Sequence, residues 1–172
     1  MYIKNKALSV VYKLILLGLT IYGVAITLVQ YGAGESLRCF TIISNVLAGA
    51  ATLYLLVERL VAWGHHGGPK RLSSYLRGMA MLSISVTCIV FNVMLAPQLE
   101  EPLGFESWVL HLMVPVGFVL DWLLFAPKST FRFPHVAVWI LPALVYEVLI
   151  LAIGPWTDFY PYPFMDVPEI GG

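Results

Sequence analysis

Charged residues are scarce in this chain. Only 12% of its 172 residues are Asp, Glu, Lys or Arg, and ten basic residues balance ten acidic ones, so the formal net charge is zero. Such a balance gives no global field that would favour nucleic acid as a partner. In contrast, 59% of the residues are hydrophobic and the mean hydropathy is +0.83, which is more apolar surface than a water-soluble domain can bury. The composition therefore predicts a membrane protein.

Cysteine and the common catalytic motifs are also nearly absent. The two cysteines, Cys39 and Cys88, lie in apolar stretches without disulfide-framework or zinc spacing, so we expect two small buried side chains. The chain has no phosphate-binding glycine motif, no GxSxG and no HExxH. His65 and His66 are adjacent in "WGHHGGPK", and no other Cys or His is nearby. We expect loop histidines there rather than a metal site, and no cofactor.

The chain consists instead of long apolar runs that are separated by turn sequences. Each run is about 20 residues, which at about 1.5 Å per residue crosses a hydrocarbon core of about 30 Å. We therefore predict an all-α, polytopic transmembrane helix bundle in which residues 1–172 form one integral membrane domain. Its five predicted spans are Leu8–Val29, Cys39–Val61, Ser74–Ala96, Ser107–Ala126 and His135–Gly154.

The two ends of the chain fit this interpretation. Lys4 and Lys6 precede an apolar run that exceeds the 7–15 residues of a typical signal-peptide core, so we expect a retained first span. Residues 155–172 contain "PWTDFYPYPF", whose Trp, Tyr, Phe and Pro suit an anchor at the outer membrane interface better than another span.

The basic residues predict the orientation. Nine of the ten fall at one end of the predicted bundle and only Arg38 falls at the other. The nine are Lys4, Lys6, Lys13, Arg59, Lys70, Arg71, Arg77, Lys128 and Arg132. Because basic loops stay on the cytoplasmic side, we predict a cytoplasmic N-terminus and an outer C-terminus.

Polar residues inside the apolar runs are the candidate functional residues. Thr41 lies at the outer start of the second span, and His111 lies about one turn inside the outer start of the fourth. Their matched depth allows contact, and a neutral imidazole is the usual base that converts a hydroxyl into a nucleophile. Helix N-termini would keep the imidazole neutral and would favour an oxyanion on a substrate carbonyl. Pro115 cannot bond the carbonyl of His111 and should kink the fourth span.

Four further residues are candidates for a supporting role. Ser44 and Asn45 share a helix face with Thr41, and Asn92 lies in the outer half of the third span, so each could donate to the oxyanion. Glu147, in the fifth span, could orient His111.

Structural roles remain open for the same residues. Thr41 can cap its helix or bond back to it, and Ser44 and Asn45 can bond across helices. His111 can serve a structural hydrogen bond as well as a functional one, and Glu147 can be a protonated structural acid.

Two other ionisable residues complete the set. Arg38 is the only basic residue on the outer side, where it either anchors a substrate carboxylate or is an ordinary flanking residue. Asp121, about ten residues beyond His111, is too deep to orient the imidazole, and we expect it to pair with Lys13.

Three segments together resemble a known family. "FTIISNVL", "LHLMVPVGFVLDWLLF" and "YPYPFMDV" are similar, in the same order, to segments of the androgen-induced-gene and androgen-dependent TFPI-regulating membrane proteins. The "DWLLF" and "PYPF" forms look most like the bacterial branch, which implies a bacterial cytoplasmic membrane. The animal members are threonine hydrolases of fatty-acid esters of hydroxy fatty acids, and their essential Thr and His match Thr41 and His111.

This sequence departs from the family pattern in its number of spans. The family usually has a sixth span after the "YPYPF" segment, whereas this sequence ends at Gly172. We expect either a shortened chain or a missing last helix, which would leave a gap facing lipid.

The favoured hypothesis is a membrane-embedded lipid ester hydrolase of the threonine type, whose partner is a lipid from the bilayer and whose active site faces the outer side. The alternative is a non-enzymatic lipid-binding or proton-coupled transport protein that uses Glu147, His111 and Asp121 as a proton path.

Overall fold

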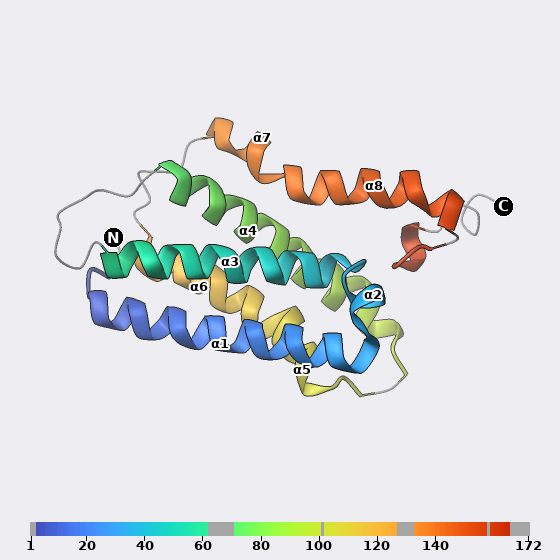
Figure 1. Ribbon diagram of the computed structural model, residues 1–172, viewed down its shortest axis with the longest axis horizontal. Helices are drawn as coiled ribbons and strands as arrows, with labels where there is room; N and C mark the ends of the chain where they lie inside the picture. Colours follow the sequence, from blue (N-terminus) through green and yellow to red (C-terminus); the bar gives the residue numbers. More distant parts are fainter. Residues whose placement is uncertain (1–2, 62–70, 101, 127–132, 158, 166–172) are drawn as a thin grey trace.

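Figure 1 shows the computed structural model, in which long helices run side by side. It describes residues 3–61, 71–100, 102–126, 133–157 and 159–165. Within these ranges the chain is helical and has no strands. His65 and His66, whose role as loop histidines we predicted, lie outside the described residues.

Five helical stretches are long and apolar enough to cross a membrane. They are Lys6–Tyr31, Phe40–Val61, Ser74–Gln98, Phe105–Phe125 and Phe133–Thr157. The predicted all-α polytopic bundle is therefore confirmed, with boundaries that differ by no more than three residues from those predicted. The chain is an integral membrane protein by these spans.

The first stretch is α1 (Lys6–Tyr31), and both of its ends have a local cause. Asn5 caps it, because its side-chain oxygen accepts a hydrogen bond from the backbone N–H of Leu8 at 3.1 Å. Gly32 ends it with a φ of +80°, a conformation that side chains disfavour. A short helix, α2 (Ala33–Ser36), then leads to α3 (Phe40–Val61).

The remaining spans are each built from several helical segments. The third consists of α4 (Arg71–Val90), a π-helical segment Phe91–Leu95 and a 3-10 turn Ala96–Gln98. The fourth consists of α5 (Phe105–Trp108), a π-helical segment Val109–Met113 and α6 (Val114–Phe125). The fifth consists of a 3-10 turn Phe133–His135, α7 (Val136–Trp139) and α8 (Leu141–Thr157), and a last 3-10 turn, Pro163–Met165, follows it.

The core lies between α1, α3, α4 and the fourth span. Small residues allow these helices to approach closely, as is usual where lipid replaces water. A Cβ at Gly23 of α1 would lie 2.6 Å from the side chain of Leu110, so a side chain there would force the fourth span away. The buried apolar cluster contains Leu16, Ala48, Ala51, Ala80, Ile84, Val109, Val114 and Phe118.

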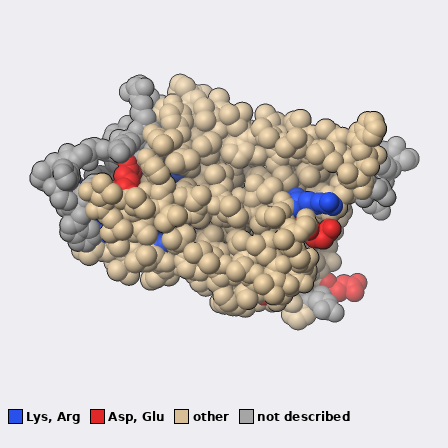
Figure 2. All heavy atoms as spheres, in the orientation of Figure 1, with Lys and Arg blue, Asp and Glu red and all other residues tan. Residues whose placement is uncertain are grey.

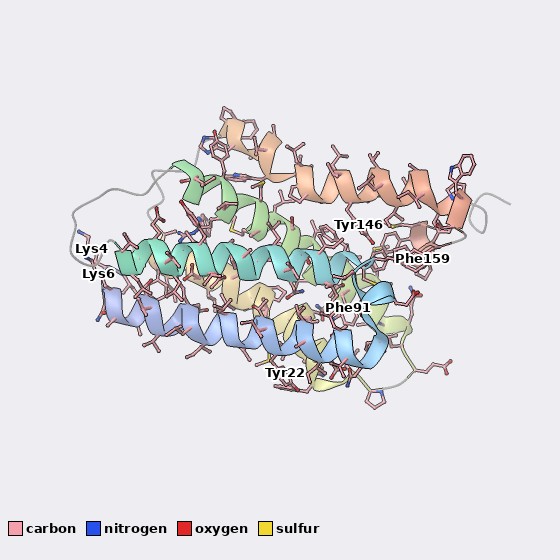
Figure 3. The ribbon with its side chains drawn as sticks, viewed as in Figure 1. Lys4, Lys6, Tyr22, Phe91, Tyr146 and Phe159 are labelled. Carbon is pink, nitrogen blue, oxygen red and sulfur yellow. The ribbon has the colours of Figure 1, made fainter. Side chains whose placement is uncertain are left out.

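The fifth span is the least covered by protein. Only 6% of its apolar window is buried, compared with 56% for α3. In Figure 1, α7 and α8 run along α4 at the edge of the bundle. Trp139 lies so close to α4 that a Cβ at Gly78 would be 2.2 Å from its indole ring. Tyr146 of α8 points toward the rest of the bundle (Figure 3), where its ring centroid lies 4.9 Å from that of Phe40.

Buried charges join three helices near the N-terminal end of α1. Lys13 of α1 forms an ion pair with Asp121 of α6, as predicted, and both side chains are 3% exposed. Arg77 of α4 approaches the other carboxylate oxygen of Asp121 at 3.8 Å. Away from such pairs the surface is apolar, and the face in Figure 2 carries its charges toward the two ends and almost none between them.

The start of α1 and the end of α8 lie at opposite ends of the bundle (Figure 1), as an odd number of spans requires. Lys4 and Lys6 lie at the end that also holds the C-terminal end of α3 and the start of α4 (Figures 1 and 3). Arg38 follows α2 at the opposite end. This arrangement is what the positive-inside prediction assumes.

A labelling experiment tests the predicted orientation. In a Cys39→Ser, Cys88→Ser background, a cysteine introduced at the exposed Glu100 should react with an impermeant thiol reagent in intact cells. A cysteine introduced at Lys4, at the other end of the bundle, should react only after permeabilisation. The reverse pattern would place the N-terminus outside.

A second prediction concerns the buried ion cluster. Asp121→Asn leaves the buried Lys13 without its ion-pair partner, so we expect a loss of about 3–5 kcal/mol in the free energy of unfolding. The measurement is the unfolding midpoint in detergent, with Glu100→Gln at an exposed site as the matched control. An Asp121→Asn protein that unfolds like the wild type would show that the cluster does not stabilise the bundle.

Candidate functional site

Thr41 and His111 meet at the start of α3. The hydroxyl oxygen Oγ1 of Thr41 lies 3.2 Å from Nε2 of His111, across a separation of 70 residues. Thr41 is the second residue of α3, and His111 is at the centre of the π-helical segment Val109–Met113. Both side chains are half-buried. The prediction that these two residues are neighbours is confirmed.

The other ring nitrogen determines which protons the imidazole carries. Nδ1 of His111 lies 2.9 Å from the backbone carbonyl oxygen of Ser107 and 3.2 Å from the Ser107 hydroxyl. A carbonyl only accepts, so in the neutral ring Nδ1 carries the hydrogen and Nε2 has a free lone pair. The Thr41 hydroxyl therefore donates to Nε2, which is the direction that a general base requires. Ser107 orients the imidazole, the role for which we had considered Glu147.

Proline explains why the helix is distorted at His111. Pro115 has no N–H for the carbonyl of His111, four residues earlier. The predicted kink takes the form of the π-helical segment, in which Val114 N–H bonds the carbonyl of Val109. Asn92 supplies the missing donor, since its Nδ2 lies 3.1 Å from the carbonyl oxygen of His111.

A second π-helical segment, Phe91–Leu95, lies opposite the first. Phe91 stacks on the imidazole of His111 with a centroid separation of 3.5 Å and an interplanar angle of 13°. Pro97 follows this segment within a 3-10 turn. Single-turn π segments often occur at functional sites because they turn a side chain out of helical register. Here they bring the two stacked rings together beside Thr41 of α3.

The polar residues beside Thr41 hold the helices together. Ser44 hydrogen-bonds to the carbonyl of Thr41 at 3.0 Å and to the hydroxyl of Thr87, on α4, at 2.7 Å. Asn45 donates to the carbonyls of Thr41 and Leu110 at 2.8 and 3.2 Å. Both side chains are fully buried.

The hydrogens of the three proposed oxyanion donors are therefore already engaged. Asn92 donates to the carbonyls of Cys88 and His111, as Ser44 and Asn45 donate to carbonyls of their own neighbours. None of the three lines the pocket described next. For Ser44 and Asn45 these contacts match the interhelical hydrogen bonding that we had considered beside the oxyanion role.

A small pocket opens beside Thr41. It lies between the start of α3, the outer half of the third span and α8, and its volume is about 80 Å³. Apolar side chains form most of its wall. The lining residues are Phe40, Thr41, Val86, Thr87, Val90, Phe91, Leu95, Ala143, Tyr146, Glu147, Tyr162, Phe164 and Met165. Because α8 is poorly covered, this pocket lies at the side of the bundle that lipid would contact.

Tyr162 is the site residue that sequence reasoning missed. It lies after the last span, in a segment that returns to the bundle so that Tyr160, Tyr162 and Met165 pack near Phe40 and Tyr146. Burial raises the pKa of its phenol, and hydrogen bonding to the side chain and backbone of Thr41 partly offsets this shift in pKa. The only signal in the sequence was the "YPYPF" segment, which we had interpreted as an interfacial anchor.

Arg38 and Glu147 occupy different positions relative to the pocket. Arg38 is 54% exposed, approaches Glu35 at 4.0 Å and lies over the ring of Phe159 at 5.0 Å. Its side chain is outside the pocket lining, while its carbonyl accepts a hydrogen bond from Tyr146. Glu147 is exposed along α8 and does line the pocket.

Cys39 is the nearest other nucleophile. Burial and the neighbouring Glu35 raise the pKa of its thiol, so the thiol stays protonated and weakly reactive. Its Sγ lies 3.7 Å from the carbonyl oxygen of Glu35, and it does not line the pocket. Among the described residues, no group of three or more His, Cys, Asp or Glu side chains could hold a metal ion.

No family model, curated protein or solved structure matches this chain. The resemblance described above therefore rests on its three sequence segments alone.

The assignment of the buried amides to interhelical bonding can be tested. Asn92→Ala leaves the carbonyl of His111 without its side-chain donor, so we expect the free energy of unfolding to fall by about 1–2 kcal/mol. Gln98→Ala is the matched control, because Gln98 also donates to a backbone carbonyl but on an exposed surface. An Asn92→Ala protein with unchanged unfolding midpoint but lost hydrolysis would return Asn92 to the oxyanion role.

Proposed function

We propose that this protein is a membrane-embedded lipid ester hydrolase in which Thr41 is the nucleophile and His111 is the general base. The observation that carries the proposal is the contact between Thr41 Oγ1 and His111 Nε2 at 3.2 Å, with Nδ1 held by Ser107. A hydroxyl, a base and a third group that orients the base form the arrangement that activates a nucleophile.

The first half of the reaction forms an acyl-enzyme. The Thr41 hydroxyl gives its proton to Nε2 of His111 while Oγ1 attacks the ester carbonyl. The tetrahedral intermediate collapses when the imidazolium returns that proton to the leaving alkoxide, which departs as an alcohol. The acyl group is then bonded to Thr41 Oγ1.

The second half releases the acid. His111 removes a proton from a water molecule, whose oxygen attacks the acyl carbonyl. The intermediate collapses with protonation of Thr41 Oγ1, which releases a carboxylic acid and restores both side chains.

Several features support a lipid substrate. The pocket beside Thr41 is mainly apolar and lies next to α8, the least covered span. An ester that diffuses in the bilayer could enter between α8 and α4 without passing through water. The resemblance adds fatty-acid esters of hydroxy fatty acids as the candidate class and a bacterial cytoplasmic membrane as the location. The positive-inside pattern adds a site toward the outer side of that membrane.

The non-enzymatic alternative needs a path between Glu147, His111 and Asp121. Asp121 pairs with Lys13 and Arg77 near the other end of the bundle, about 15 Å along the helix from His111. This pairing favours the enzyme over a proton path.

Substitutions at the pair provide the direct test. Thr41→Ala and His111→Ala should each lower kcat/KM for lipid-ester hydrolysis by about 10³-fold or more. The double variant should be little worse than either single variant, because the two residues act as a unit. Cys39→Ser should keep wild-type activity, and all variants should unfold near the wild-type midpoint. The measurement is acid release from a long-chain ester in detergent or vesicles.

Covalent labelling separates the two functional classes. A lipid phosphonate probe should form one adduct per chain on Thr41, located by peptide mapping. Full hydrolysis by Thr41→Ala, or absence of the adduct from active wild-type protein, would overturn the proposed mechanism.

A further inference from the structure

The mechanism needs a donor for the oxyanion, and the side chains first considered cannot supply one. Ser44, Asn45 and Asn92 use their hydrogens on partners within the bundle. Thr87 lines the pocket, but its hydroxyl shares a 2.7 Å hydrogen bond with Ser44. An ester carbonyl that approaches Thr41 from the pocket therefore needs another donor, since removing one such donor typically costs about 10²–10³-fold in rate.

Tyr162 is the remaining hydroxyl beside Thr41. It lines the same pocket as Thr41, and its phenol hydrogen-bonds with the hydroxyls of both Thr41 and Tyr146. The other pocket tyrosine, Tyr146, is committed, because its hydroxyl donates to the carbonyl of Arg38 at 2.9 Å. Glu147, when ionised, can only accept.

The segment around Tyr162 is built to hold that side chain in place. The backbone N–H of Met165 bonds the carbonyl of Tyr162 at 2.9 Å and closes a tight turn at Pro163–Met165. Met165 is 5% exposed and packs with Phe40 and Tyr146, so the turn is fastened to α3 and α8. In Figure 3, Tyr146 and Phe159 are near one another beside the start of α3.

We propose that Tyr162 is the hydrogen-bond donor to the oxyanion formed on the substrate carbonyl, an inference that rests on the proposed function. In the tetrahedral intermediate the Thr41 oxygen and the oxyanion are bonded to the same carbon. A phenol that lines the pocket beside Thr41 can then turn its O–H from its hydroxyl partners toward the oxyanion. The phenol keeps its proton throughout: it donates a hydrogen bond to the oxyanion, and all proton transfer passes through His111.

Backbone groups strengthen this donor. The start of α3 has backbone N–H groups with no partner inside the helix, and hydrogen bonding from the backbone of Phe40 and Thr41 acts against the rise in the pKa of Tyr162. Donors at the phenol oxygen polarise its O–H, which makes the hydrogen it offers more positive. The helix N-terminus thus stabilises the oxyanion through the tyrosine.

Tyr162→Phe is the test, because it removes one oxygen and keeps the ring that packs against Phe40. We expect kcat for lipid-ester hydrolysis to fall by about 10²–10³-fold while KM changes by only a few-fold. Tyr160→Phe is the matched control: Tyr160 lies in the same segment, contacts Gly154 and does not line the pocket. It should keep wild-type kcat.

Two ligands separate a donor from a packing residue. A lipid boronic acid forms a tetrahedral, oxyanion-like adduct with a Thr hydroxyl, whereas the ether analogue of the substrate has no carbonyl oxygen. Tyr162→Phe should weaken inhibition by the boronic acid about as much as it lowers kcat and leave the ether analogue's inhibition constant unchanged. Equal weakening of both ligands, or a Tyr162→Phe protein with wild-type kcat, would overturn the assignment.

Thr41→Ala is assayed in parallel to separate the two proposals. An inactive Thr41→Ala protein beside a fully active Tyr162→Phe protein would remove only the role of Tyr162. An active Thr41→Ala protein would remove the proposed function, and the role of Tyr162 with it.

Discussion

A backbone carbonyl in the core of a bilayer must find its hydrogen-bond donor within the protein. Pro115 removes the helical donor for the carbonyl of His111, and the arrangement around the site follows from how that carbonyl is satisfied. The fourth span loosens into a π turn, and Asn92 donates across from the third span. This places His111 against Phe91 and turns Nε2 toward Thr41. One missing N–H thus explains the position of the imidazole, the buried amide and the contact between the third and fourth spans.

The polar residues near the site then fall into two groups with different physical tasks. Ser44 and Asn45 are fully buried, and their bonds join α3 to its neighbours, where an unsatisfied polar group would be costly. Thr41 and Tyr162 instead face a pocket, where their hydroxyls can exchange partners when a substrate arrives. Residue type does not distinguish these groups, because a hydroxyl or an amide suits either task. The distinction depends on whether the hydrogen is already committed to a backbone carbonyl.

Whether a hydrogen is committed in this way could not be predicted from the sequence, although much of the fold could. The five spans and their ends follow from hydropathy and turn residues, since an apolar run of about 20 residues has few alternatives. The matched depth of Thr41 and His111 allows them to meet, and the family resemblance completed that prediction. The pairing of Lys13 with Asp121 follows from the cost of leaving either charge alone. The sequence indicates the rotation of each helix about its axis only weakly, because lipid and protein interior are equally apolar. The sequence therefore did not show that the hydrogens of our candidate oxyanion donors, Ser44, Asn45 and Asn92, bond within the bundle. The return of Tyr162 depends on packing among aromatic residues distant in sequence, which no periodic pattern reveals.

The distribution of charge between the two ends gives the site its chemical character. Near the N-terminal end of α1, Lys13, Arg77 and Asp121 are ionised partners that hold three helices together. Around Thr41 the contacts are made by neutral groups: a hydroxyl, an imidazole, a phenol and backbone carbonyls. Attack on an ester would create an imidazolium and an oxyanion in surroundings of low dielectric, where fixed dipoles act more strongly than in water. Nearby ion pairs would screen or compete with those new charges. Neutral side chains at the reacting atoms, with the buried ionic cluster at the far end and the charged groups nearer the site exposed, therefore suit a reaction in which charge appears only in the transition state.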